Sequence, residues 1–225
     1  MKRTIVIGDI HGCYDELIAL LEKTGLTTED RVVAVGDLIV KGRKNKEVLD
    51  LFSSDERFSS VIGNHDLAVL KFWRGETTDL KETQRRACLE LAAGQERYAA
   101  YLSSLPSKID LGSHVVVHAG VRPGIKLEDQ ALEDLTELRT LGPDRTNRDG
   151  TPWYEVYDDE KVILYGHWPS PMPRRSGHAI GLDTGCVYGY QLTAYVIEAD
   201  QFIQVTANQV YTTPKQRPSK GPGQD

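Results

Sequence analysis

Five short runs of apolar, mostly β-branched residues occur along this chain of 225 residues, and each ends directly in polar residues. Such runs indicate buried β-strands. After the first run, residues 4–7, Asp9 and His11 stand two positions apart between Gly8 and Gly12, so their side chains can turn to the same side. A carboxylate and an imidazole in this arrangement are typical of half of a metal site.

The other four runs lead into more side chains of the same kinds. They are Asp37 after residues 32–35, Asn64 with His65 and Asp66 after 61–62, His118 after 115–117, and His167 after 162–165. Open α/β sheets place ligands at the carboxyl ends of their strands. The sequence therefore predicts that these side chains gather into one site.

The order of the segments predicts an α/β fold with mixed sheets. Helical spacing of Leu17, Leu20 and Leu21 places a crossover helix after the first strand. By the right-handed crossover rule the second strand lies parallel to the first, and a helix through 47–52 and a strand at 61–62 complete a βαβαβ unit. Later segments predict a hairpin and an antiparallel meander in a second sheet; they are 108–118 for the hairpin and 179–182, 192–197 and 202–205 for the meander.

The domain organisation predicted is a single domain over residues 1–212. A helical pattern from 65 to about 105 indicates either an inserted cap or an ordinary packed helical layer without a role in substrate choice. The irregular connection over 121–160 is long enough to indicate a functional loop. The tail over 213–225, made of Pro, Lys, Gly, Gln and Ser, is predicted to be disordered.

Charge and cysteine content exclude several classes of function. A net charge of -6 argues against a general binder of double-stranded nucleic acid or of anionic membranes. The three cysteines lack C-x-x-C spacing, so neither a disulfide framework nor a cysteine zinc site is indicated. The first strand leaves no room for a cleavable signal, and no apolar run has membrane-spanning length. A cytoplasmic protein is expected, and the composition carries no prediction of its oligomeric state.

Taken in order, the polar motifs at the strand ends resemble those of the calcineurin-like metallophosphoesterases, over residues 4 to about 206. They are GDIHG at 8–12, GD at 36–37, GNHD at 63–66, HAG at 118–120 and GH at 166–167. Further stretches are similar to the symmetrical diadenosine tetraphosphate hydrolases (bis(5'-nucleosyl)-tetraphosphatases) and the ApaH-like phosphatases; they are GDIHGCYDEL at 8–17, GDLIVKG at 36–42, RTL at 139–141, YGH at 165–167 and LDTGCVY at 182–188. The resemblance implies a four-layer α-β-β-α sandwich with two mixed β-sheets, and a pair of divalent metal ions.

The resemblance also implies a ligand set for the two metals. The first metal would be held by Asp9 and His11, the second by Asn64, His118 and His167, and Asp37 would bridge both. Oxygen ligands mixed with imidazole suit Mn²⁺, the metal we expect, with Fe, Zn²⁺ and Co²⁺ as alternatives. A hydroxide shared between the metals would attack phosphorus in line.

Two further residues match functional positions of the family, and a third, Lys41, replaces the residue found at such a position in part of it. His65 resembles its general acid, and the alternative is a histidine at a helix N-terminus satisfied by solvent. Arg139 matches the phosphate-binding arginine, and the alternative is a surface salt bridge. Lys41 would also bind substrate phosphate. Asp66 is more typical of a first-turn carboxylate favoured by the helix dipole than of a catalytic group.

The chain departs from the protein Ser/Thr phosphatases of this superfamily at residues 40 and 41. Those enzymes have Asp-Arg where this chain has Val40-Lys41. Without an orienting carboxylate His65 is a weaker acid, which matters little when the leaving group is itself a phosphate. Lys41 has a mobile ammonium group in place of the planar guanidinium group of arginine. Such a compact charge suits a chain of phosphates.

The substitution favours phosphoanhydride substrates. The resemblance implies dinucleoside polyphosphates, inorganic polyphosphate or nucleotide-capped RNA. Two alternatives remain open: a Ser/Thr phosphoprotein phosphatase, and a non-catalytic metal-binding scaffold. The presence of all six proposed ligands and of His65 counts against the scaffold.

Overall fold

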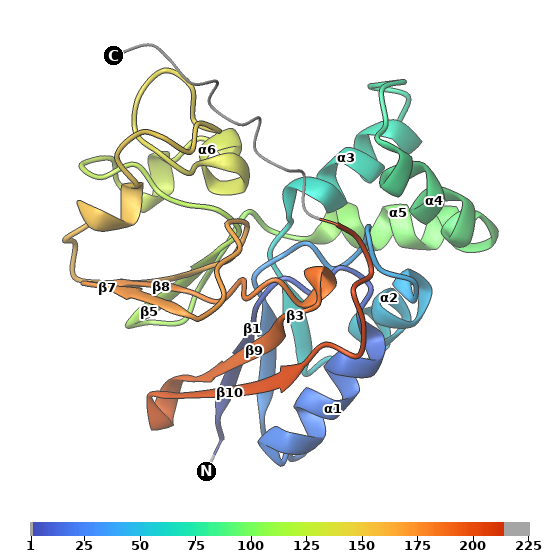
Figure 1. The fold of residues 1–225 in the computed structure, drawn as a ribbon, viewed down its shortest axis with the longest axis horizontal. Helices are drawn as coiled ribbons and strands as arrows, with labels where there is room; N and C mark the ends of the chain where they lie inside the picture. The colour runs from blue at the N-terminus through green and yellow to red at the C-terminus, as the bar shows by residue number, and fades with distance from the viewer. Residues whose placement is uncertain (1, 214–225) are drawn as a thin grey trace, which may run out of the picture.

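Two five-stranded mixed sheets form the centre of the computed structural model, which describes residues 2–213 (Figure 1). The first sheet contains, in spatial order, β10 (Gln201–Thr206), β9 (Gln191–Val196), β1 (Thr4–Ile7), β2 (Arg31–Ala34) and β3 (Phe58–Ser60). The second contains β4 (Lys108–Asp110), β5 (His114–Val117), β6 (Val162–Tyr165), β8 (Ala179–Gly181) and β7 (Arg174–Ser176). In each sheet parallel pairs are flanked by antiparallel ones, so the predicted mixed sheets are confirmed.

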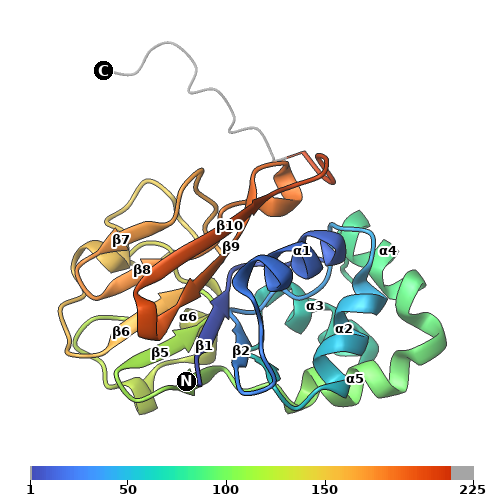
Figure 2. The same cartoon turned by 90° about the horizontal axis from the view of Figure 1, so that it is seen from below.

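Helices cover the outer faces of both sheets. Beside the first sheet, α1 (Tyr14–Thr24) and α2 (Asn45–Ser54) contact its strands, and α3 (Asn64–Trp73), α4 (Glu82–Leu91) and α5 (Gln95–Ser104) pack against α2 or against one another. The second sheet is covered by α6 (Leu132–Glu137). Single 3₁₀ turns complete the chain: η1 (Ala92–Gly94), η2 (Leu127–Asp129), η3 (Trp153–Glu155), η4 (Cys186–Tyr188) and η5 (Ile197–Ala199). Figure 2 shows α1–α5 on one flank, the β5–β8 strands on the other, and β1, β2 and β9 between them.

Strand side chains alternate between three separate apolar layers. In β1, Ile5 and Ile7 face the cluster beneath the helices, while Val6 joins the cluster between the two sheets. In β5, Val116 enters the inter-sheet cluster and its neighbours Val115 and Val117 enter the cluster under α6. Because the side chains of a strand alternate in direction, both sheets are buried on both faces. Three apolar layers between four layers of structure confirm the predicted sandwich.

The crossover helix after β1 forms as predicted. Leu17 and Leu20 lie on its buried face, and Gly25 ends the helix in the left-handed conformation with φ 61°. β2 then pairs parallel to β1, with Val6 opposite Val33. The loops that leave both strands at their carboxyl ends therefore start side by side.

Two strand predictions were wrong in detail. The third strand is 58–60 rather than 61–62, because Ile62 donates its backbone N–H to Pro106 and leaves the sheet. The prediction that 179–182 forms a meander with the last two strands is wrong. Instead β8 pairs parallel to β6 in the second sheet and antiparallel to β7, a hairpin partner that the sequence did not reveal.

No helix among residues 2–213 combines the length and the apolar character needed to cross a membrane. Helices occupy most of 64–104, and they pack against α2 and against one another. The predicted tail of 213–225 lies, apart from its first residue, outside the described residues.

Candidate metal and phosphate site

The six predicted ligands converge where loops leave the two sheets. Asp9 and His11 follow β1, and Asp37 follows β2, both in the first sheet. The others come from the start of α3 and from the second sheet: Asn64 is the first residue of α3, His118 follows β5 and His167 follows β6. Since parallel β1 and β2 end next to each other and β5 and β6 do likewise, the site lies where the two sheets meet.

One group of donor atoms surrounds the amide oxygen of Asn64. Its Oδ1 lies 3.0 Å from His118 Nε2 and 3.0 Å from His167 Nδ1. Asp37 Oδ1 lies 3.6 Å from the same His118 nitrogen. Two imidazole nitrogens, an amide oxygen and a carboxylate oxygen at this spacing form a donor set of the kind that binds a transition metal.

A second group of donor atoms lies on the other side of Asp37. Its Oδ2 is 3.4 Å from His11 Nε2, which in turn is 3.9 Å from Asp9 Oδ2. The two oxygens of Asp37 thus face different histidines. The ammonium group of Lys41 lies 2.6 Å from His11 Nε2, so a cation already fits beside this group.

Backbone carbonyls orient two of the histidine rings. His11 Nδ1 donates to the carbonyl of Ile39 at 3.1 Å, and His118 Nδ1 donates to that of Val35 at 2.9 Å. Each Nε2 then carries the free lone pair: that of His11 faces Lys41 and Asp37, and that of His118 faces Asn64 and Asp37. Histidines that bind metals are held by this type of contact.

The loops that carry the site residues are strained. Among the described residues, five of the six non-glycine residues with positive φ belong to the site or to the adjacent 36–42 loop: His11 (49°), Asp37 (51°), Val40 (77°), Lys41 (71°) and His167 (65°). For a β-branched residue such as Val40 this conformation is a true outlier. Strain of this kind concentrates at functional sites, where the surrounding structure enforces it.

Two glycines leave room for the carboxylates. A Cβ at Gly166 would lie 1.9 Å from Asp9 Oδ1, and one at Gly63 would lie 2.2 Å from Asp37 Oδ1. Any larger residue would displace the ligand oxygens. The motifs GNHD and GH therefore need their glycines for close approach.

Burial sets the protonation of the site. It raises the pKa of Asp9 well above its usual value, with the charges of Asp183 and Asp37 acting in the same direction. Burial likewise lowers the pKa of His11 and of His167 well below their usual values. Neutral imidazoles are the ligand form that metals require, and buried carboxylates without a counter-charge are costly. The donor set thus fits a pair of divalent cations.

His65 lies beside the donor groups without belonging to the Asn64 group. Its ring centroid is 5.2 Å from that of His11, and its backbone N–H donates to Asp37 Oδ1 at 2.9 Å. Its Nδ1 is buried and has no hydrogen-bond partner among the described residues. Within residues 2–213 the hydrogen bond between His65 and a carboxylate is the one made by its backbone N–H. Asp66, in contrast, accepts the amide protons of Gly63, Leu38 and Ile39, which is a structural role.

A cleft of about 1150 Å³ opens over the donor groups. Lys41 and Arg139, both predicted to bind phosphate, line it, so Arg139 is not simply half of a surface salt bridge. Arg139 Nε is buried without a hydrogen-bond partner in the described chain. Asp183 belongs to the LDTG motif, for which the sequence predicted no functional residue. This carboxylate also lines the cleft and acts on the pKa of Asp9.

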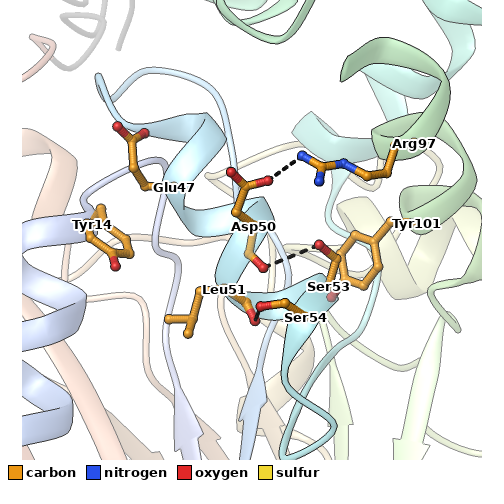
Figure 3. A pocket seen from close by; sticks show the side chains of 8 residues that line it. All are labelled: Tyr14, Glu47, Asp50, Leu51, Ser53, Ser54, Arg97 and Tyr101. Atoms are coloured by element: carbon orange, nitrogen blue, oxygen red, sulfur yellow. Dashed lines mark hydrogen bonds and ion pairs between the residues drawn. The ribbon is translucent and has the colours of Figure 1, made fainter. Parts of the chain in front are cut away.

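Another cavity, of about 650 Å³, lies between α2 and α5 (Figure 3). One of its charged residues, Asp50, already bonds to Arg97, to Lys46 and to the hydroxyl of Tyr98. The cavity holds none of the predicted site residues.

Comparisons with known proteins show similarity over most of the chain. The family model described as calcineurin-like phosphoesterase matches residues 2–197. The asymmetrical bis(5'-nucleosyl)-tetraphosphatase PrpE of Bacillus velezensis is 31% identical, over 96% of this chain and 97% of its own. The symmetrical bis(5'-nucleosyl)-tetraphosphatase of Vibrio parahaemolyticus is 28% identical, over 84% of this chain and 93% of its own.

A solved structure described as a candidate diadenosine tetraphosphatase has the same fold. It superimposes with a TM-score of 0.76 at 31% sequence identity, and the match covers 91% of this chain and 93% of that one.

Proposed function

Since this chain belongs to the calcineurin-like phosphoesterase family, we propose that it is a hydrolase that cleaves phosphoanhydride bonds of nucleotide polyphosphates with the help of two divalent metal ions. The relatives named bis(5'-nucleosyl)-tetraphosphatases support this substrate class. The observation that carries the proposal is the position of Asp37, whose two carboxylate oxygens face separate groups of donor atoms.

Each metal would have its own ligands and share one. Asp9 and His11 would hold the first, Asn64, His118 and His167 the second, and Asp37 both. When bound, two such ions lower the pKa of a water molecule and neutralise the charge on phosphate oxygens. Mn²⁺ is the ion we propose, because the donor set mixes hard oxygens with imidazole nitrogens.

The remaining site residues would act on the substrate directly. Arg139 and Lys41 line the cleft and would bind oxygens of the phosphate under attack. His65 would donate a proton to the leaving oxygen. Because its Nδ1 lacks a partner in the described chain, His65 is poorly oriented as an acid, and a leaving group that needs little protonation suits this site best.

A panel of substrates tests the proposal. The protein is loaded with Mn²⁺ and assayed on diadenosine tetraphosphate, inorganic tripolyphosphate and a phosphoserine peptide. We expect kcat/KM on the anhydrides to exceed that on the peptide by about tenfold or more, or ~1.4 kcal/mol of transition-state stabilisation. Equal efficiency on the peptide would replace the proposal by a protein phosphatase. Metal binding without turnover of any substrate would replace it by a binding scaffold.

A further inference from the structure

Four cationic side chains line the cleft: Lys41, Lys81, Arg139 and Arg148. The proposed mechanism uses only Lys41 and Arg139. Lys81 and Arg148 are exposed, and neither makes an ion pair or a side-chain hydrogen bond with any residue in 2–213. In a chain of net charge -6, two unpaired cations at the mouth of a cleft need an explanation. Unpaired cations around a concave site attract anionic ligands.

These two cations approach the site from opposite sides. Lys81 is the N-cap residue of α4, in the helical layer α3–α5. Arg148 lies in the loop that follows α6 and leads to η3. Figure 1 shows the helical layer and the α6 region on opposite sides of the strands. The cleft therefore has one free cation from each flank.

Arg139 and Arg148 both line the cleft, and the positive charge of Arg148 acts on Arg139. Burial lowers the pKa of Arg139 to about 10, and the positive charge of Arg148 is the next cause. Asp183 and Glu137 offset part of this repulsion. Two guanidinium groups in one cleft, with no carboxylate bonded to either in the described chain, are stabilised when a ligand brings a separate phosphate group to each.

The size of the cleft also exceeds what a single phosphate group requires. Its volume of about 1150 Å³ lies above the ~300–1,000 Å³ typical of pockets for small ligands. Two aromatic side chains, the partly buried Tyr188 and the exposed Tyr190, and the carboxylates Glu82 and Glu137 line it as well. Tyrosine rings offer faces on which a nucleobase can stack.

We propose that Lys81 and Arg148 bind the phosphates that flank the cleaved bond, one on each side, so that the cleft selects a chain of several phosphates over a single phosphate. This inference rests on the proposed function and deepens it. It assigns the helical layer over 64–104 a part in substrate choice, through the N-cap residue of α4.

The test compares neutral variants of the two cations with a matched control. Lys81→Gln, Arg148→Gln and the double variant are assayed with Mn²⁺ on diadenosine tetraphosphate and on p-nitrophenyl phosphate, which has only one phosphate. Arg86→Gln is the control, because Arg86 is an exposed cation of the same helix α4 and does not line the cleft. Affinity for inorganic tripolyphosphate and for orthophosphate is measured by calorimetry on the same proteins.

For each single variant we expect KM for diadenosine tetraphosphate to rise about three- to tenfold, with a smaller change in kcat. The loss of kcat/KM in the double variant should be at least about fivefold larger on the tetraphosphate than on p-nitrophenyl phosphate. Tripolyphosphate affinity should fall more than orthophosphate affinity. Arg86→Gln should match the unmodified protein.

Two results are contrary to the proposals and can be told apart. If the unmodified protein turns over p-nitrophenyl phosphate but no anhydride, the proposed function fails, and the inference fails with it. If it turns over diadenosine tetraphosphate and the double variant loses no more on this substrate than on p-nitrophenyl phosphate, the inference alone is overturned.

Discussion

At the scale of single residues, the site contains buried polar side-chain atoms whose capacity for hydrogen bonds is not used within the described chain. His65 Nδ1, Arg139 Nε and His167 Nε2 are buried without hydrogen-bond partners in the described chain. Buried polar atoms are normally satisfied, and each exception calls for a reason. A site that binds cations and phosphate supplies that reason for all three.

Asp37→Asn is expected to weaken the binding of both metals. The substitution keeps the size of the side chain and an oxygen that can accept the His65 backbone N–H, but it removes the charge that faces both histidines. Metal per chain, measured by elemental analysis after dialysis, should fall from about two to below about one. Asp129→Asn, at an exposed carboxylate outside the cleft, is the control. Two retained metals with normal turnover would reject the assignment.

His65→Ala is expected to damage the hydrolysis of esters more than that of anhydrides. Acid catalysis contributes ~10²–10⁴ only where the leaving oxygen needs a proton. The measurement is the ratio of the two losses in kcat, on an alkyl phosphomonoester and on diadenosine tetraphosphate. Equal losses on both substrates would contradict the role of His65 as proton donor.

At the scale of elements, the loop over residues 36–42 is where this chain differs from the Ser/Thr phosphatase pattern. Val40 is fully buried in the apolar cluster beneath the helices, with φ 77°. A carboxylate at this position would be buried among apolar side chains, which is costly. Val40 therefore has two effects at once: it packs the loop against the apolar cluster, and it leaves His65 without an orienting carboxylate.

Lys41→Arg tests that loop without disturbing the apolar cluster. A guanidinium group can bind phosphate through two parallel hydrogen bonds, which an ammonium group cannot. We expect kcat/KM on p-nitrophenyl phosphate to rise by about two- to tenfold, which narrows the gap to the anhydrides. Lys44→Arg, at an exposed lysine paired with Asp15, should have no effect. A wider gap in Lys41→Arg would show that the mobile ammonium group does not cause the preference.

A second prediction at this scale concerns Asp30, which connects β1 to the segment between α1 and β2. Its buried carboxylate accepts two side-chain bonds and one backbone bond from Arg3, and one backbone bond from Thr27. Asp30→Asn should lower the free energy of unfolding by about 1.5–3 kcal/mol at pH 7, the usual range for bonds to a charged group. Glu128→Gln, at an exposed carboxylate, is the control.

The effect of Asp30→Asn should depend on pH in a defined direction. The hydrogen bond from Arg3 holds the pKa of Asp30 well below its usual range. The stabilisation is therefore complete above the unfolded-state pKa of about 3.9 and is lost as the pH falls below it. Urea unfolding at pH 7, 5, 4 and 3 should give a difference between the two proteins that shrinks below pH ~4. A difference that grows on acidification would contradict this.

At the scale of the whole molecule, folding brings together residues that are far apart in the sequence. The ligand atoms of Cys13, Glu16 and Cys186 lie within 4.8 Å of one another. Cys13 precedes α1 and Cys186 begins η4. Both cysteines are free and almost completely inaccessible, at 0% and 1% exposed.

This burial predicts the reactivity of the three thiols. Under native conditions only Cys88, which is partly exposed on α4, should react with a disulfide reagent, and its reaction should be slow because burial raises its pKa. Cys13 and Cys186 should react only after unfolding in urea. Native thiol counting should give about one of the three cysteines, and Cys88→Ser should remove that signal. Fast modification of Cys186 in the native protein would refute the prediction.

Local pattern was sufficient to predict much of this protein. The run at 4–7 followed by Asp9 and His11, and the similar endings at Asp37, Asn64, His118 and His167, indicated strands and ligand types together. Both are encoded locally, by period-two burial and by the donor chemistry of each side chain. The helix after β1 and its parallel neighbour β2 followed from helical spacing and crossover handedness.

Only the tertiary structure decided which distant segments meet. It placed β8 beside β6 instead of β9, because strand pairing across long separations leaves no local pattern. It likewise set which nitrogen of His118 faces Asn64, and it brought Lys81 and Arg148 to one cleft from opposite flanks. An exposed Lys or Arg looks the same in sequence wherever it lies. Its role depends on which residues lie near it in the folded protein.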